Sequence, residues 1–108
     1  LEERGRRYVL VHAGIRGFDE ERALDEYDCA DFLFERTDYG RRYYEDRRTY
    51  LVTGHTPTLV IRPDGKPEIY QENGHIAVDC GCVFGGQLAA YCVETGETVY
   101  VKGNRKRV

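Results

Sequence analysis

With 108 residues, the chain is long enough for one modest hydrophobic core and for no more than one domain. Charged residues make up 32% and hydrophobic residues 41%, as in globular proteins, and no apolar run approaches the ~20 residues of a membrane span. The net charge of −3 argues against a dedicated nucleic-acid binder, and the basic clusters near both ends are expected to be solvated. We therefore expect a cytoplasmic protein that has neither nucleic acid nor a membrane as its partner.

The four cysteines are Cys29, Cys80, Cys82 and Cys92. Their even number permits disulfides, but nothing else is typical of a small secreted scaffold, and C-x-C is not the C-x-x-C spacing of a zinc site. We expect buried, reduced thiols, with Cys80 and Cys82 on the same face of a strand. The sequence contains no methionine, so Leu1 is not an untouched translation start, and we expect the chain to be a piece of a longer protein.

The first half of the chain has the pattern of a strand followed by a helix. The apolar run "YVLV" at 8–11 predicts a strand that is covered on both faces. After the break at "HAGIRG", an acidic segment with apolar residues at helical spacing predicts a loop and then a short helix over 28–35, with Asp19 or Asp28 as a possible N-terminal cap. Residues 37–48 are polar and aromatic without a period, which predicts a loop.

The second half of the chain is rich in predicted strands. We expect strands at residues 50–53, 76–82, 87–93 and 98–101. "RPDGKP" should join two further strands as a hairpin, Asn73-Gly74 should form another turn, and "ETGE" should connect the last two strands. The order is a strand, a helix and about six strands, which indicates an α/β start followed by antiparallel pairing.

Two of the three histidines share one setting. His12 follows "YVLV", and His55 follows "YLVTG", so each stands where an apolar strand meets a glycine-containing loop. If the two strands are neighbours, both rings reach into the crevice beyond the carboxyl ends of the strands, where α/β proteins bind ligands. Neutral imidazole is the commonest metal ligand, although two are too few for a catalytic metal. The alternative is that each is a hydrogen-bonded structural residue at a strand end.

Three segments in order resemble a known family. "VLVHAGI", "LVTGHTPT" and "HIAVDCGCVFGGQLAAYCVETG" are similar to the C-terminal half of a calcineurin-like metallophosphoesterase, in the branch of the phosphoprotein phosphatases and the bacterial enzymes similar to them. The likeness runs from about Tyr8 to Val101. It implies that residues 1–108 are the C-terminal portion of an α/β/β/α sandwich domain, with a mixed, mostly antiparallel sheet and one short helix.

The resemblance also implies roles for individual residues. The histidines of the "HAG"-type and "GHT"-type motifs bind one metal of a two-metal centre, which assigns this role to His12 and His55. The arginine of a "WxR"-like motif holds the substrate phosphate, and "FER" places it at Arg36. The implied cofactors are two divalent ions, Mn²⁺ first and Fe or Zn as alternatives. His75 has no role in the pattern, and Phe84 lies near the position of an active-site tyrosine in eukaryotic relatives.

The family's earlier motifs, G-D-x-H-G, G-D-x-x-D-R-G and G-N-H-E, are not in the sequence. In the family they supply the other metal ligands and the histidine that protonates the leaving group. The partners implied are therefore the missing N-terminal half and a phosphorylated substrate, either a phosphoprotein or a small phosphate ester. We expect a two-metal phosphoesterase, serine/threonine phosphoprotein phosphatase-like, in the full-length protein, and no activity in this chain alone.

Three other functions are considered. The first is hydrolysis of dinucleoside polyphosphates at the same kind of centre. The second is a non-catalytic protein-binding module, formed by the acidic segment 19–31 and an aromatic loop with Tyr39, Tyr43 and Tyr44. The third is a structural zinc site that combines the two histidines with cysteines.

Overall fold

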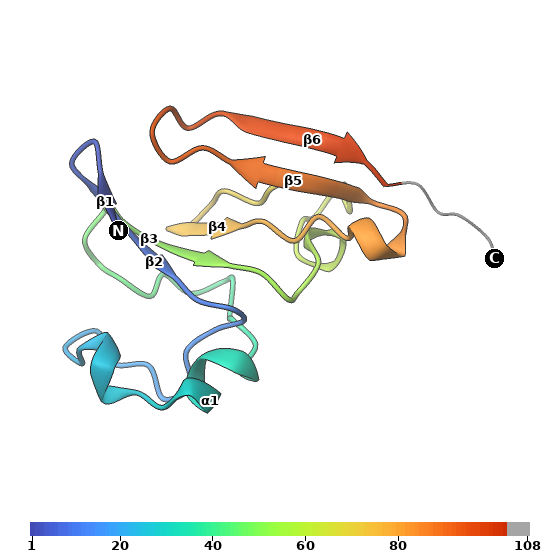
Figure 1. Ribbon diagram of the computed structural model, residues 1–108. Helices are drawn as coiled ribbons and strands as arrows, with labels where there is room; N and C mark the ends of the chain where they lie inside the picture. Colours follow the sequence, from blue (N-terminus) through green and yellow to red (C-terminus); the bar gives the residue numbers. More distant parts are fainter. Residues whose placement is uncertain (104–108) are drawn as a thin grey trace.

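The computed structural model describes residues 1–103 and places six strands in two sheets (Figure 1). One sheet has four strands in the order β1-β2-β3-β4, and the other is the hairpin β5-β6. The strands are β1 (Glu2–Glu3), β2 (Arg6–Leu10), β3 (Thr49–Thr53), β4 (His75–Ala77), β5 (Gln87–Tyr91) and β6 (Thr98–Lys102). The helical elements are the 3₁₀ turns η1 (Leu24–Glu26), η2 (Thr58–Val60) and η3 (Cys82–Phe84) and the helix α1 (Cys29–Leu33).

The four-stranded sheet is mixed. β1 pairs antiparallel with β2, whereas β2 with β3 and β3 with β4 are parallel, with Tyr8 opposite Tyr50 and Val52 opposite Ile76. Parallel neighbours need a long crossover, and the first one carries η1 and α1. The predicted α/β class, a mixed sheet with one short helix, is confirmed, and so is the final antiparallel hairpin. The antiparallel pairing expected throughout the second half is wrong for β4, which pairs in parallel with β3.

The short helix forms where the acidic pattern placed it. Asp28 precedes α1, and its backbone N–H donates to the Asp31 carboxylate at 2.9 Å, which fixes the first turn. The helix ends at Leu33, two residues before the predicted boundary. No helix in the described part of the chain is long and apolar enough to span a membrane.

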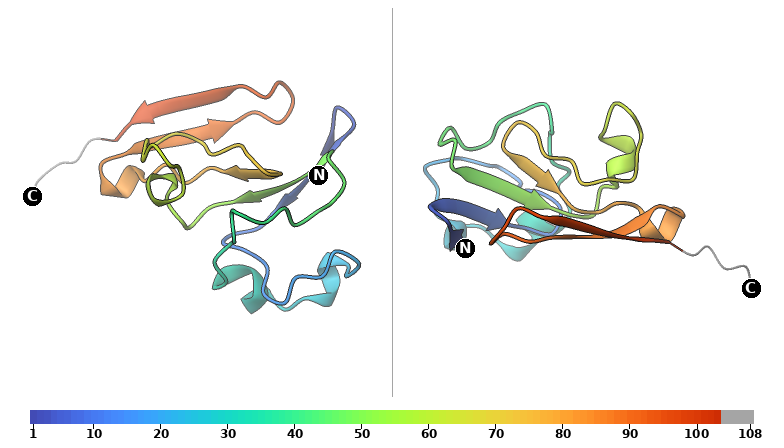
Figure 2. Two further views of the ribbon diagram at one scale, coloured as in Figure 1. Left: turned by 180° about the vertical axis from the view of Figure 1, so that it is seen from behind. Right: turned by 90° about the horizontal axis from the view of Figure 1, so that it is seen from above.

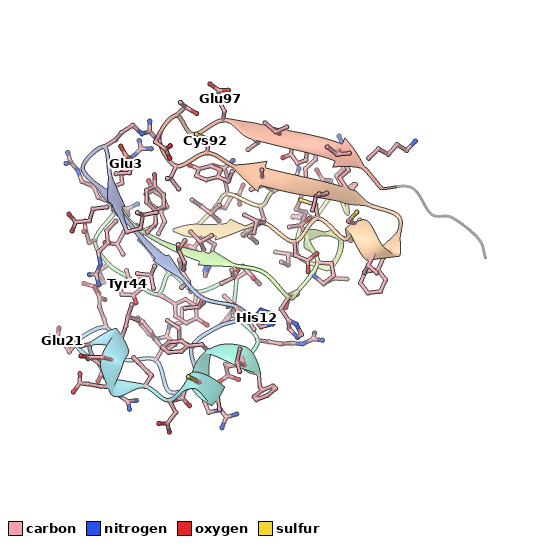
Figure 3. The ribbon with its side chains drawn as sticks, in the orientation of Figure 1. Glu3, His12, Glu21, Tyr44, Cys92 and Glu97 are labelled. Atoms are coloured by element: carbon pink, nitrogen blue, oxygen red, sulfur yellow. The ribbon has the colours of Figure 1, made fainter. Side chains whose placement is uncertain are left out.

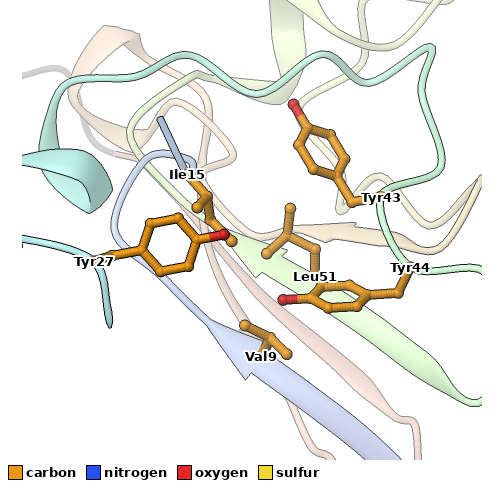
Figure 4. Packing of buried hydrophobic residues seen from close by; sticks show 6 residues of the cluster. All are labelled: Val9, Ile15, Tyr27, Tyr43, Tyr44 and Leu51. Atoms are coloured by element: carbon orange, nitrogen blue, oxygen red, sulfur yellow. The ribbon is translucent and has the colours of Figure 1, made fainter. Parts of the chain in front are cut away.

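One face of the mixed sheet packs against the crossover that carries α1. Val9 of β2 and Leu51 of β3 point into this layer, where aromatic side chains cover them (Figure 4). The buried members of this cluster are Val9, Ile15, Tyr27, Tyr43, Tyr44 and Leu51. Phe18 packs edge-on to Tyr43 and Tyr44, with ring centroids 5.0 and 5.1 Å away.

The opposite face of the sheet packs against the β5-β6 hairpin, which Figure 2 shows from behind and from above. Tyr8 stacks on Tyr50 across the strand pair, with ring centroids 5.6 Å apart, and Tyr91 of the hairpin lies over Tyr8. Ile76 belongs to the same buried cluster. The sheet is therefore covered on both faces at Tyr8 and Val9, as the apolar run at 8–11 predicted, but Leu10 at the end of β2 is 57% exposed.

The prediction of a hairpin at "RPDGKP" is wrong. The residues before this turn form η2 instead of a strand, and Arg62 N–H donates to the Thr58 carbonyl at 2.9 Å. The Arg62 guanidinium then binds the Asp64 carboxylate and the Ile69 carbonyl, which folds the loop back on itself. These side-chain contacts replace the ladder of a hairpin, and pairing resumes only at the single bridge between Tyr70 and Ala77.

The strand predicted over 76–82 is shorter than expected. β4 ends at Ala77, and Gly81 adopts a left-handed conformation (φ 71°) that starts η3. Cys80 is therefore buried and Cys82 exposed, so the expectation that they share a face is wrong. All four cysteines are free, as expected. The predicted burial is confirmed for Cys80 alone, because Cys29 and Cys82 are exposed and Cys92 is half-buried.

His75 is the structural histidine of this fold. The residue is 1% exposed, and its Nε2–H donates to the Arg41 carbonyl at 2.6 Å. In the neutral ring, Nδ1 is then an unprotonated, buried nitrogen that has no hydrogen-bond partner in the described residues. The rings of Tyr39 and Tyr43 pack against it. Burial lowers the pKa of His75 below its usual value, because a charged ring would lose its hydration.

The lowered pKa of His75 predicts a stability that falls in acid. Because the unfolded chain takes up a proton on this ring more readily than the native state, the free energy of unfolding decreases as the pH falls below about 6.5. The substitution His75→Gln keeps a donor for the Arg41 carbonyl and removes the titration. We expect the melting temperature of His75→Gln to depend less on pH, between about pH 7 and about pH 5, than that of the wild type. Equal slopes for the two proteins would contradict this role.

Candidate functional site

His12 and His55 lie side by side at the carboxyl ends of β2 and β3. The parallel pairing continues beyond the strands, because Val11 N–H donates to the Val52 carbonyl at 3.0 Å and Gly54 N–H donates to the His12 carbonyl at 2.9 Å. The two imidazole centroids are 5.2 Å apart, with the ring planes inclined by 46°. Figure 3 shows His12 at this end of β2, beside the chain that leaves β3. The adjacency of the strands thus brings together the two histidines that share a sequence setting.

The backbone at His55 is strained. Its φ is 68°, in the left-handed region that residues other than glycine rarely adopt. Thr56 N–H donates to the Gly54 carbonyl at 2.8 Å, so residues 54–56 form a tight γ-turn centred on the histidine. Such strain costs about 1–3 kcal/mol, persists only where the surrounding structure enforces it, and is concentrated at functional sites.

Neither ring has the surroundings of a structural histidine. Both side chains are exposed, and neither imidazole forms a hydrogen bond with any residue in 1–103. His75, which is buried and bonded to a carbonyl, fits that description instead. The ring nitrogens of His12 and His55 are therefore available to a ligand.

The segment that carries Arg36 is fastened to the residues after His12. Thr37 is buried, and its hydroxyl donates to the Ala13 carbonyl at 2.8 Å. Gly14 permits this approach, because a Cβ at its position would lie 2.6 Å from the Glu35 carbonyl oxygen. Arg36 itself is exposed, and the ion pairs found in residues 1–103 all belong to Arg62. The backbone around Arg36 is thus fixed against the segment that follows His12. The Arg36 guanidinium has no carboxylate partner in the described chain.

Arg36 and His55 line one cavity of about 530 Å³. The remaining lining residues are Thr56, Pro57, Leu59, Val60 and Phe84. The buried hydroxyl of Thr56 has no hydrogen-bond partner within residues 1–103. Leu59 and Val60 were not predicted as site residues, because the hairpin expected at "RPDGKP" implied a strand just before it. The signal against that strand was Pro57, which lacks the N–H that a ladder requires.

The histidine pair fits part of a metal site. Two imidazoles that share one divalent ion, at about 2.1 Å per bond, have ring centroids roughly 5 Å apart, and the observed separation is 5.2 Å. Within residues 1–103, however, no group of three His, Cys, Asp or Glu side chains gathers in a metal-binding arrangement. The idea of a zinc site completed by cysteines therefore lacks its further ligands in this part of the chain.

The aromatic loop does not form the binding surface that was considered as an alternative. Tyr43 and Tyr44 are buried in the core, and Tyr39 is half-buried against His75 and Tyr70. The Tyr39 hydroxyl also bonds to the Thr53 hydroxyl at 2.6 Å, and burial raises its pKa. These side chains hold the loop on the sheet, so they are not free to bind another protein.

No protein-family model matches the chain. It is 31% identical over 107 residues to the asymmetrical bis(5'-nucleosyl)-tetraphosphatase PrpE of Geobacillus sp. (strain WCH70), an alignment that covers 88% of this chain and 40% of that protein. It is 38% identical over 66 residues to the protein of the same name from Oceanobacillus iheyensis, with 61% of this chain and 22% of that protein covered. The chain thus spans well under half the length of these relatives, which are named as hydrolases.

The close approach at Gly14 generates a prediction. We expect Gly14→Ala to destabilise the fold by about 1–3 kcal/mol, because the added methyl group displaces the Glu35–Thr37 segment. Gly54→Ala is the matched control, since a Cβ there would make an ordinary contact, at 3.5 Å, with the His12 carbonyl oxygen. Chemical unfolding of both variants measures the difference. If Gly14→Ala proves no less stable than Gly54→Ala, the segment that carries Arg36 is not held in this way.

Proposed function

We propose that the protein is a metal-dependent phosphoesterase, in which His12 and His55 bind one of two divalent ions and Arg36 binds the substrate phosphate. The observation that carries this proposal is the meeting of two exposed imidazoles, which have no hydrogen bonds in the described chain. One of them, His55, lines the same cavity as the Arg36 guanidinium, which has no carboxylate partner there. The similarity to proteins named as tetraphosphatases supports a hydrolase that acts on phosphate compounds.

Each residue has a role that its chemistry suits. Neutral imidazole nitrogens of His12 and His55 would serve as metal ligands, and the γ-turn at His55 sets the direction of its ring. The planar Arg36 guanidinium can donate to two phosphate oxygens at once and offset the negative charge that they carry in the transition state. The ions, when bound, would polarise the phosphoryl group and activate a water molecule. Mn²⁺ is the first choice, with Fe or Zn as alternatives, since mixed nitrogen and oxygen ligands select weakly.

The names of the relatives bear on the substrate. Both are bis(5'-nucleosyl)-tetraphosphatases, so we propose a dinucleoside polyphosphate as the first substrate class and a serine/threonine phosphoprotein as the second. The remaining metal ligands and the acid for the leaving group are proposed to come from the part of the whole protein that corresponds to the uncovered length of the relatives. The 108-residue chain alone should then be inactive and bind metal weakly.

The metal role of the histidine pair can be tested in the whole protein. We expect His12→Ala and His55→Ala each to lower Mn²⁺-dependent hydrolysis of p-nitrophenyl phosphate by at least about 100-fold, because each removes a metal ligand. Melting temperatures should stay close to that of the wild type, since both side chains are exposed. Titration with Mn²⁺, followed by calorimetry, should show weaker binding in both variants. A loss of stability without a loss of metal affinity would indicate structural roles instead.

Arg36 gives a second test of the same proposal. We expect Arg36→Ala to lower kcat/KM by about 10²–10³-fold, because a charge-assisted donor to the transferred phosphoryl group is lost. Arg36→Lys should recover only part of this loss, since an ammonium group lacks the two-pronged geometry. Arg47→Ala, at another exposed arginine, is the control and should retain wild-type activity. Equal activities for Arg36→Ala and Arg47→Ala would remove Arg36 from the site.

A further inference from the structure

The cavity beside Arg36 and His55 has an apolar wall that is unusually exposed. Val60 and Phe84 line it with 72% and 62% of their surfaces accessible, and the half-buried Leu59 lines it as well. Exposed apolar groups that gather in one concave site mark places where a ligand or another surface binds. This wall lines the same cavity as Arg36, the residue proposed to bind phosphate.

The backbone of Phe84 is held in place by the turn that contains it. It ends η3, which lies between two glycines in the left-handed conformation, Gly81 (φ 71°) and Gly85 (φ 87°). Phe84 N–H donates to the Gly81 carbonyl at 2.9 Å. A Cβ on Gly81 would lie 2.7 Å from a methyl carbon of Leu59, so this turn is pressed directly against the other apolar segment of the wall. The fold thus fixes the backbone from which the Phe84 ring projects.

The lining of the cavity indicates what would occupy it. The guanidinium of Arg36 favours a phosphate group, and the ring of Phe84 favours a flat apolar group. Such a group stacked on an aromatic side chain is the usual way in which proteins bind an unpaired nucleobase. The volume of about 530 Å³ lies in the ordinary range for small-molecule sites. Thr56 also offers a buried hydroxyl that has no partner in residues 1–103.

We propose that Leu59, Val60 and Phe84 form a nucleobase subsite, in which the base of a nucleotide substrate stacks on Phe84 while its phosphate chain reaches Arg36. This inference deepens the proposed function and rests on it for the position of the phosphate. It identifies specificity residues that discriminate nucleotides from phosphate compounds without a base. The other possible occupant of the wall, an apolar side chain from elsewhere in the whole protein, is an outcome of the test.

The experiment compares two neighbouring residues of one turn in the whole protein. Phe84→Ala removes the stacking face, whereas Val83→Ala alters a side chain that is 82% exposed and does not line the cavity. The substrates are diadenosine tetraphosphate and inorganic tripolyphosphate, which has the anhydride bonds without a base. We expect Phe84→Ala to raise KM for diadenosine tetraphosphate by about 5- to 100-fold and to leave KM for tripolyphosphate within about twofold. Val83→Ala should change neither value.

A binding measurement separates the subsite from the activity. The affinities of adenosine diphosphate and of pyrophosphate, measured by calorimetry with Mn²⁺ present, should differ in the wild type and become similar in Phe84→Ala. If the wild type hydrolyses neither substrate but this difference in affinity is found, the phosphoesterase proposal fails and the subsite stands. If hydrolysis is observed and Phe84→Ala affects both substrates alike or neither, the subsite is overturned and the phosphoesterase proposal stands.

A third outcome would show that another part of the whole protein covers Phe84. If Phe84→Ala lowers the melting temperature far more than Val83→Ala, Phe84 is buried by another part of the protein, and the subsite is overturned. Val60→Ala provides a second, milder variant in case Phe84→Ala fails to fold. It should raise KM for diadenosine tetraphosphate in the same direction by a smaller factor, without an effect on tripolyphosphate. An unchanged KM in Val60→Ala, if Phe84→Ala is not folded, would also contradict the subsite.

Discussion

The parallel pairing of β2 with β3 is the constraint on which the candidate site depends. Its register places Leu10 opposite Val52, and the backbone bonds continue past the strands until Gly54 N–H reaches the His12 carbonyl. Side chains at the ends of adjacent parallel strands must emerge at the same edge of a sheet. The histidines are therefore brought together by backbone hydrogen bonds and do not need a contact of their own.

The pairing is stable because the sheet has a core on each face. The aromatic crossover covers Val9 and Leu51, and the β5-β6 hairpin covers Tyr8 and Tyr50. A rigid sheet of this kind can enforce the strained γ-turn at His55, which an isolated loop would relax. Glycine contacts extend the same rigidity to the loops around the site, since residues 35–37 lie against Gly14 and η3 lies against Leu59.

The electrostatics of the site differ from those of the whole chain. The protein has a net charge of −3, yet the described groups around His55 and Arg36 include no carboxylate that pairs with the guanidinium. Such a site favours an anion, and the adjoining wall of Val60 and Phe84 favours an apolar group on the same ligand. The two histidines contribute nitrogen donors but lack the acidic side chains that would complete a metal centre within the described chain.

The sequence by itself determined the elements with strong local signals: the apolar run of β2, the capped helix α1, the Asn73-Gly74 turn and the last hairpin. It also singled out His12, His55 and Arg36, because motif spacing survives in the linear chain. It failed at η2 and η3, where contacts between distant segments decide the conformation: Thr58 N–H bonds to the Asp79 carbonyl, and Gly81 packs on Leu59. The tertiary structure alone decided that His12 meets His55 and that Arg36 and Phe84 line one cavity with His55. Strand order and close glycine contacts depend on residues far apart in the sequence, so local signals could not show this.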